Sequence, residues 1–129
     1  KHRYFGFDDA VYSTARLLEI LTHEAQPLSQ LLSDVPRTWS SPELRVDTVE
    51  EKKFELVRRC TEHFRAQGRE LIDVDGVRVR IADGWGLIRA SNTQPILVLR
   101  FEAASEAGLA EIRSVIDGTV ASMRLELGA

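Results

Sequence analysis

Cysteine is almost absent from this sequence of 129 residues, in which Cys60 is the only one. A single thiol cannot form an internal disulfide, so oxidation does not hold the fold together, and a cytoplasmic origin is expected. Cys60 falls within a helical pattern, which predicts a quiet thiol in the core or at its boundary rather than a nucleophile.

Surplus positive charge is also missing, because 17 Lys and Arg are outnumbered by 20 Asp and Glu, which gives a net charge of -3. This balance does not favour binding to nucleic-acid phosphates or to an anionic membrane surface. No apolar run approaches the ~18 residues that a membrane-spanning helix needs, and the opening residues are expected to contain no signal peptide. We therefore expect neither nucleic acid nor a membrane as a partner.

Patterns for metal binding and covalent catalysis are lacking too. His2, His23 and His63 are far apart, and none sits in a motif with metal-ligand spacing. Asp73 and Asp75 flank a valine, but the glycine that follows makes them turn formers first. No Gly-x-Ser-x-Gly motif or Cys/His arrangement supports a nucleophile. The sequence thus predicts no metal site and no catalytic residue.

The most informative stretch is a short polar loop, residues 89–95, between two apolar runs rich in β-formers. Arg89 offers a planar fork of donors that matches two phosphate oxygens at once. Ser91 and Thr93 each offer a hydroxyl, and Asn92 offers an amide and tolerates the backbone geometry of an anion nest. On chemistry alone two interpretations stay open: a site for a tetrahedral dianion, and a polar hairpin tip with a solvated arginine.

The loop Arg89-Ala90-Ser91-Asn92-Thr93-Gln94-Pro95 and the run Ile96-Leu97-Val98-Leu99-Arg100-Phe101-Glu102 resemble the phosphate-binding loop of the α-D-phosphohexomutases, most closely the bacterial phosphomannomutase/phosphoglucomutase group. In that family an Arg-x-Ser-Asn-Thr-x-Pro loop in the last of four domains grips the substrate phosphate. The resemblance implies that Arg89, Ser91, Asn92 and Thr93 bind substrate phosphate. Arg100 is interpreted as a charge on the sheet face or an indirect support of these ligands.

The resemblance also implies an activity for a longer enzyme. Phosphohexomutases interconvert hexose 1-phosphate and hexose 6-phosphate through a phosphoserine and a 1,6-bisphosphate, with Mg²⁺ held by an aspartate loop in earlier domains. This piece is then expected to clamp the phosphate of glucose or mannose 1- or 6-phosphate, to close the active site, and to be inactive alone. Mg²⁺ and glucose 1,6-bisphosphate are expected in the parent enzyme, with neither bound by this chain.

Two alternatives remain open at this point. One is a stand-alone module that binds a phosphate ligand or a protein and reuses the fold. The other is the same domain of a phosphoglucosamine mutase, since the family's sugar-reading loop, Glu-x-Ser-Gly-His, is absent from this sequence.

The organisation of the chain follows from the same comparison. The chain opens without Met, and the run Arg-Tyr-Phe-Gly-Phe-Asp-Asp resembles the end of the mutases' third domain, so residues 1–35 are expected to be its last strand and helix. Two prolines and two serines within residues 36–42 are typical of a linker or hinge. Residues 43–129 are expected to form the terminal domain, which in the family is TATA-binding-protein-like in architecture.

Periodicity and turn signals predict an α+β fold, two layers with helices on one face of a mainly antiparallel sheet. A capping box at residues 48–51 and Ser105 are expected to cap helices, with tight turns at residues 75–76 and 83–84. The expected elements are a helix to residue 24 after Asp8-Asp9, a helical turn from Pro27, a helix to residue 67 ended by Gly68, a helix over 106–125, and strands over 43–48, 71–74, 77–81, 86–90 and 96–102. The expected apolar faces are Val11, Leu17, Leu18 and Leu21; Phe54, Val57, Thr61 and Phe64; Leu97, Leu99 and Phe101; and Leu109, Ile112, Ile116, Val120 and Met123.

Overall fold

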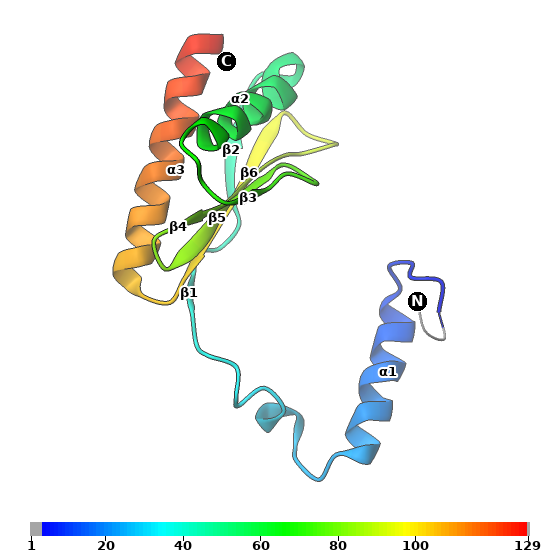
Figure 1. Ribbon diagram of the computed structural model, residues 1–129. Coiled ribbons are helices and arrows are strands. Elements are labelled where there is room, and N and C mark those ends of the chain that lie inside the picture. Colours follow the sequence, from blue (N-terminus) through cyan, green and yellow to red (C-terminus); the bar gives the residue numbers. More distant parts are fainter. Residues whose placement is uncertain (1–3, 129) are drawn as a thin grey trace. The chain divides into compact units, whose positions relative to one another are not determined.

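The computed structural model describes residues 4–128, and its chain divides into two compact units, Lys1–Pro36 and Arg37–Ala129 (Figure 1). No helix within the described residues is long and apolar enough to cross a membrane.

The first unit is built around helix α1, Ala10–His23, which Asp9 caps by accepting a hydrogen bond of 2.9 Å from the backbone N–H of Tyr12. Tyr4 stacks on Tyr12 with ring centres 4.0 Å apart and donates its O–H to Asp9 at 2.8 Å. These two donated hydrogen bonds lower the pKa of Asp9 because they stabilise its charged form. The helix and its acidic cap are as predicted, and the turn η1, Leu28–Gln30, follows Pro27 as expected.

The strand expected before this helix is not present at residues 4–9, and residues 1–3 lie outside the described part. A strand needs a neighbour to satisfy its backbone N–H and C=O groups, and this unit offers none among its described residues. The apolar stripe of α1 is largely exposed, with Val11 at 82% and Leu18 at 58%. None of the residues of α1 is buried.

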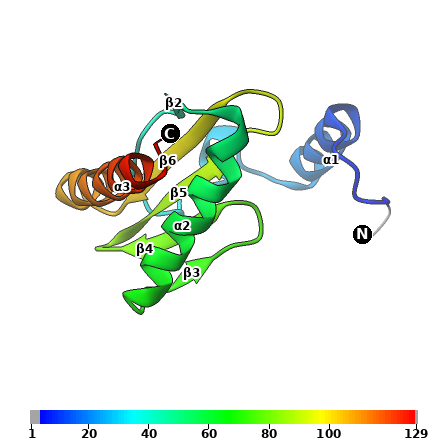
Figure 2. The same cartoon turned by 90° about the horizontal axis from the view of Figure 1, so that it is seen from above.

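The second unit is a six-stranded, fully antiparallel sheet with two helices on one face (Figures 1 and 2). The sheet path is β1-β6-β5-β4-β3, and β2 also pairs with β6. α2 and α3 cover the same face, and no helix in the described part of this unit covers the other one, which is here called the open face. The predicted α+β two-layer class is confirmed. The elements are β1 Trp39–Ser40, β2 Leu44–Asp47, η2 Glu50–Lys52, α2 Lys53–Ala66, β3 Leu71–Ile72, β4 Val77–Ile81, β5 Gly84–Ala90, β6 Ile96–Ala103 and α3 Glu106–Leu127.

The core lies between the sheet and the two helices, and strand alternation decides which residues enter it. Residues of β4 are buried and exposed in strict turn, beginning and ending with a buried residue. On α3, whose cap Ser105 accepts from the N–H of Gly108 at 3.0 Å, the predicted apolar stripe faces this core. The sequence periodicity correctly predicts these buried apolar residues: Val57, Phe64, Leu97, Leu99, Phe101, Ile112, Ile116 and Val120.

Two predictions about α2 are wrong. Phe54 is 59% exposed, and the buried face instead carries Lys53, Leu56 and Cys60 beside Val57. The capping box at residues 48–51 does not form, because the 3-10 turn η2 precedes α2 and makes no side-chain cap. The start of the helix is set by tertiary contacts rather than by a local cap.

Two boundaries also need correction. The stretch expected as linker already belongs to the sheet at β1, where Trp39 pairs with Ala103, so the linker prediction fails for residues 39–40. The second hairpin turns at Ala82, which has a positive φ of 49°, and Gly84 already lies in β5. A side chain at Gly84 would stand 2.0 Å from the carbonyl oxygen of Glu102, so glycine is needed there for close strand packing.

Candidate functional site

The polar loop predicted from the sequence connects β5 to β6 at one end of the sheet. Its base is closed by the backbone N–H of Ser91, which donates to the carbonyl oxygen of Ile96 at 3.0 Å. The Ser91 Oγ then accepts from the N–H groups of Thr93 at 3.3 Å and Gln94 at 3.2 Å. Ser91 therefore shapes the loop as well as offering its O–H, since a hydroxyl can accept and donate together.

Arg89 is the residue before the last of β5, where it pairs with Val98 of β6. Its neighbours Ile88 and Ala90 are buried in the core, so alternation places Arg89 on the open face of the sheet. The Nε atom is buried and has no hydrogen-bond partner among the described residues, while the side chain as a whole is 43% exposed. A buried N–H without an acceptor is costly, and an anion bound at this point would satisfy it.

Asn92 and Thr93 lie at the exposed tip of the same loop. The hairpin therefore brings all four predicted phosphate ligands to one end of the sheet. Arg100 lies on β6 and pairs with Leu87 of β5. It is exposed on the face that carries Arg89, one row of side chains farther from the loop. This position agrees with a charge on the sheet face behind the loop.

Lys53 is part of this site, and the sequence did not indicate it. Its side chain is only 1% exposed, and its Nζ donates to the carbonyl oxygen of Gln94 in the loop at 3.2 Å. The ammonium is balanced by Glu50, whose Oε1 lies 2.6 Å away. The next loop residue, Pro95, accepts from the backbone N–H of Thr48 at 2.9 Å. The start of α2 thus holds the exit of the loop, and no local pattern marks a lysine for such a role.

Asp75 is a second residue that the sequence assigned only to a turn. Its Oδ2 lies 3.4 Å from Nη1 of Arg89, although 14 residues separate the two in sequence. The turn between β3 and β4 rests against β5 at this point, and only a fold can reveal that approach.

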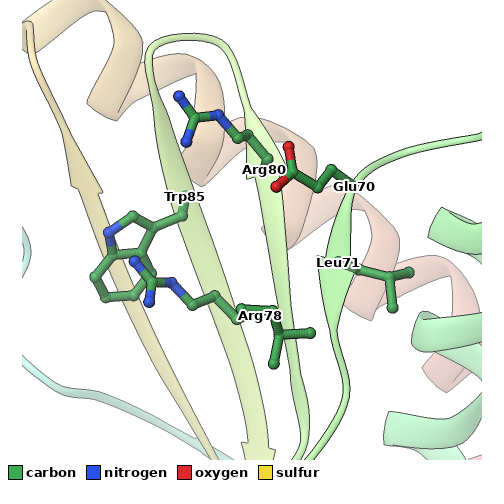
Figure 3. A pocket seen from close by; sticks show the side chains of 6 residues that line it. Glu70, Leu71, Arg78, Arg80 and Trp85 are labelled. Carbon is green, nitrogen blue, oxygen red and sulfur yellow. The ribbon is translucent and has the colours of Figure 1, made fainter.

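The open face also carries a shallow pocket of about 150 Å³, formed mainly by Arg78, Arg80, Trp85 and Glu70 (Figure 3). The guanidinium of Arg78 lies over the indole of Trp85, 4.1 Å from the ring centre, which is a cation–π contact. Trp85 and Arg89 are four residues apart on β5, or about 13 Å at the usual rise of a strand. The pocket therefore belongs to the other end of the sheet, and one of its two arginines, Arg78, is already engaged by the indole.

The described residues hold no group of three or more His, Cys, Asp or Glu side chains arranged for a metal ion. Burial raises the pKa of Cys60 to about 12, so the thiol stays protonated and is a poor nucleophile near neutral pH. The chemistry that the described part of the site offers is the binding of an anion, through one guanidinium, two hydroxyls, an amide and backbone N–H groups.

Comparison with known proteins shows which family the chain belongs to. Residues 43–118 match the C-terminal domain of phosphoglucomutase/phosphomannomutase. The chain belongs to this family. A phosphomannomutase/phosphoglucomutase from Pseudomonas putida is 47% identical over 115 residues, which cover 89% of this chain and 25% of that protein. A phosphoglucomutase from Neisseria gonorrhoeae is 42% identical over 124 residues, covering 95% of this chain and 27% of that protein.

Solved structures agree with the sequence comparisons. A phosphoglucomutase/phosphomannomutase family protein from Burkholderia thailandensis superimposes with a TM-score of 0.76 at 41% identity, and the match covers 96% of this chain and 26% of that one. This phosphohexomutase domain thus spans about a quarter of the length of the relatives it matches.

Proposed function

We propose that the β5–β6 loop of this chain binds the phosphate group of a phosphosugar, and that the chain acts as the C-terminal domain of a phosphomannomutase/phosphoglucomutase. The observation that carries the proposal is Arg89, whose buried Nε has no acceptor among the described residues. It stands at the base of a loop that adds two hydroxyls and an amide within four residues. A tetrahedral dianion supplies the acceptors that this set of donors lacks.

In this role the loop recognises phosphate without reading the sugar. Phosphoryl transfer depends mainly on position and on stabilisation of charge, so a clamp on the distal phosphate orients the reacting group. The mutase reaction presents its phosphate from C6 in one half-reaction and from C1 in the other. Donors that contact only the phosphate, as Arg89, Ser91, Asn92 and Thr93 are proposed to do, accept both orientations.

The rest of the chemistry is proposed to lie outside this chain. The phosphoserine, the Mg²⁺ site and the contacts to glucose 1,6-bisphosphate would belong to other parts of a longer enzyme, and the chain alone would be inactive. Residues 1–35 would complete a preceding domain, and the segment before β1 would act as the hinge that closes the loop over substrate and excludes water. Glucose or mannose phosphate and the preceding domains are then the partners.

A phosphoglucosamine mutase is the second candidate. A probable phosphoglucosamine mutase from Methanopyrus kandleri is 37% identical over 107 residues, below the 47% of the Pseudomonas putida protein. The higher identity favours mannose and glucose phosphates as substrates.

The proposal is tested by kinetics in a chimera, in which this chain replaces the matching segment of the Pseudomonas putida protein. We expect Arg89→Ala to lower kcat/KM for glucose 1-phosphate by roughly 30- to 1000-fold, about 2–4 kcal/mol, because a charge-assisted contact is lost. Arg89→Lys should restore only part of it, since an ammonium lacks the two-pronged geometry. Arg78→Ala is the matched control, because it removes an arginine of the same sheet face that is engaged with Trp85. If the Arg89→Ala chimera kept an unchanged kcat/KM, the loop would be only a polar hairpin and the proposal would be wrong.

A further inference from the structure

The turn between β3 and β4 is built to lie against Arg89. Gly76 has a φ of +81°, and a Cβ at this position would stand 2.3 Å from the carbonyl oxygen of Ile88 and 2.9 Å from the Cα of Arg89. Only glycine allows this approach of the two backbones. The preceding residue, Asp75, is thereby held with its carboxylate beside the guanidinium, Oδ2 to Nη1 at 3.4 Å.

The contact is too weak to be what places Arg89. It is one long contact rather than a bidentate pair. The side chain of Asp75 is 68% exposed and that of Arg89 is 43% exposed, so water and salt screen the contact. The arginine is already positioned by its place in β5 and by the burial of its Nε atom. Asp75 therefore adds mainly a negative charge at the edge of the group that receives the phosphate.

We propose that Asp75 is an internal anion that competes with the phosphate for Arg89 and weakens the grip of the loop. The inference rests on the proposed function, because it requires that Arg89 binds phosphate. An arriving dianion must displace the carboxylate of Asp75 from Arg89 or bind against its repulsion. When the dianion departs, Asp75 can pair with the guanidinium again. A bound phosphate is thus released faster than the loop donors alone would allow. Such reversibility suits a reaction in which the clamp must release one phosphate and take the other.

The test is a titration of the 129-residue chain with inorganic phosphate, followed by NMR through the backbone amides of residues 91–94. We expect Asp75→Asn to lower the Kd for phosphate about threefold at low salt, and this gain to shrink as KCl is added. Asparagine before glycine keeps the tight turn. Because an Asn-Gly pair can deamidate back to aspartate, Asp75→Ser is the second variant, with the same expected direction.

Asp73→Asn is the matched control. It removes the same charge from the same connection, but the carboxylate of Asp73 pairs with Arg65 at 2.6 Å, whereas Arg89 pairs with Asp75. The Kd of the Asp73→Asn variant for phosphate should stay at the wild-type value if the effect of Asp75 comes from the position of Asp75 beside Arg89. An equal gain in Asp73→Asn would show a general charge effect and overturn the proposal.

The remaining outcomes separate this inference from the proposed function. If Arg89→Gln abolishes phosphate binding while both Asp75 variants bind as the wild type does or more weakly, the loop is a phosphate site and the role of Asp75 is wrong. If wild type and Arg89→Gln respond alike to phosphate, both proposals fail. In the chimera, Asp75→Asn should lower KM for glucose 1-phosphate without raising kcat, because tighter binding of ground state and transition state alike leaves kcat unimproved.

Discussion

The ammonium of Lys53 lies 3.2 Å from the backbone carbonyl oxygen of Gln94, which ties the first residue of α2 to the loop between β5 and β6. The lysine is almost completely buried, and Glu50 balances its charge from the preceding turn. A loop with an exposed tip at Asn92 is therefore held at its exit by a buried cation. This arrangement keeps the donors of the loop in place without a bound anion.

We predict that Lys53→Met weakens phosphate binding more than it weakens the fold. Methionine fills a similar volume, and Glu50 is exposed enough for water to solvate it, so the loss of stability should be about 1 kcal/mol. The Kd for inorganic phosphate should rise several-fold as the loop loses its tether and a nearby charge. Thermal unfolding and the NMR titration measure the two effects.

Lys52→Met is the control for this change. Lys52 donates to the carbonyl oxygens of Leu127 and Gly128 at 2.8 and 2.9 Å, at the end of α3 and away from the loop. The Lys52→Met substitution removes the same charge from the residue just before Lys53, so phosphate binding should be nearly unchanged. Equal losses of affinity in the two variants would contradict a specific role for Lys53.

Gly76→Ala is predicted to destabilise the domain by about 2–4 kcal/mol, because it combines a positive φ with a clash against the backbone of β5. Gly68 separates the two effects. It also has a positive φ, +69°, but a Cβ there meets nothing within 4 Å, so Gly68→Ala should cost only about 1 kcal/mol. Urea unfolding of both variants measures the loss in free energy of unfolding. Similar losses would show that the β3–β4 turn is not packed closely against the backbone of Arg89.

The buried thiol gives a prediction about pH. Since burial raises the pKa of Cys60 to about 12, above the ordinary value of 9.0, the folded state keeps its proton while the unfolded state loses it. The unfolded state then binds fewer protons above pH 9, so this contribution to stability is full below pH 9 and falls as the pH rises towards 12. The stability advantage of the wild type over Cys60→Ala should narrow over this window.

Thiol reactivity checks the same burial independently. At pH 8 a thiol reagent should label Cys60 slowly in the folded chain and rapidly in denaturant, because labelling must await opening of the core. Rapid labelling of the folded chain would show that the core around α2 is not closed.

The sequence by itself determined the elements whose signals are local. Alternation over residues 77–81 placed β4, Ser105 placed the start of α3, and Gly68 placed the end of α2, because these patterns depend only on neighbours along the chain. The loop motif at residues 89–95 likewise identified the family without any fold. Each of these features is decided within a few residues.

Tertiary structure decided what depends on distant partners. Trp39 became a strand residue because β6 offered it a backbone partner 64 positions away at Ala103. Lys53, rather than Phe54, turned inward because a loop carbonyl and Glu50 compensate its burial. Asp75 reached Arg89 only because the glycine after it lets two strands meet. Periodicity reports which face of an element is apolar, whereas the contacts that bury a charge or set one beside another exist only after the chain has folded.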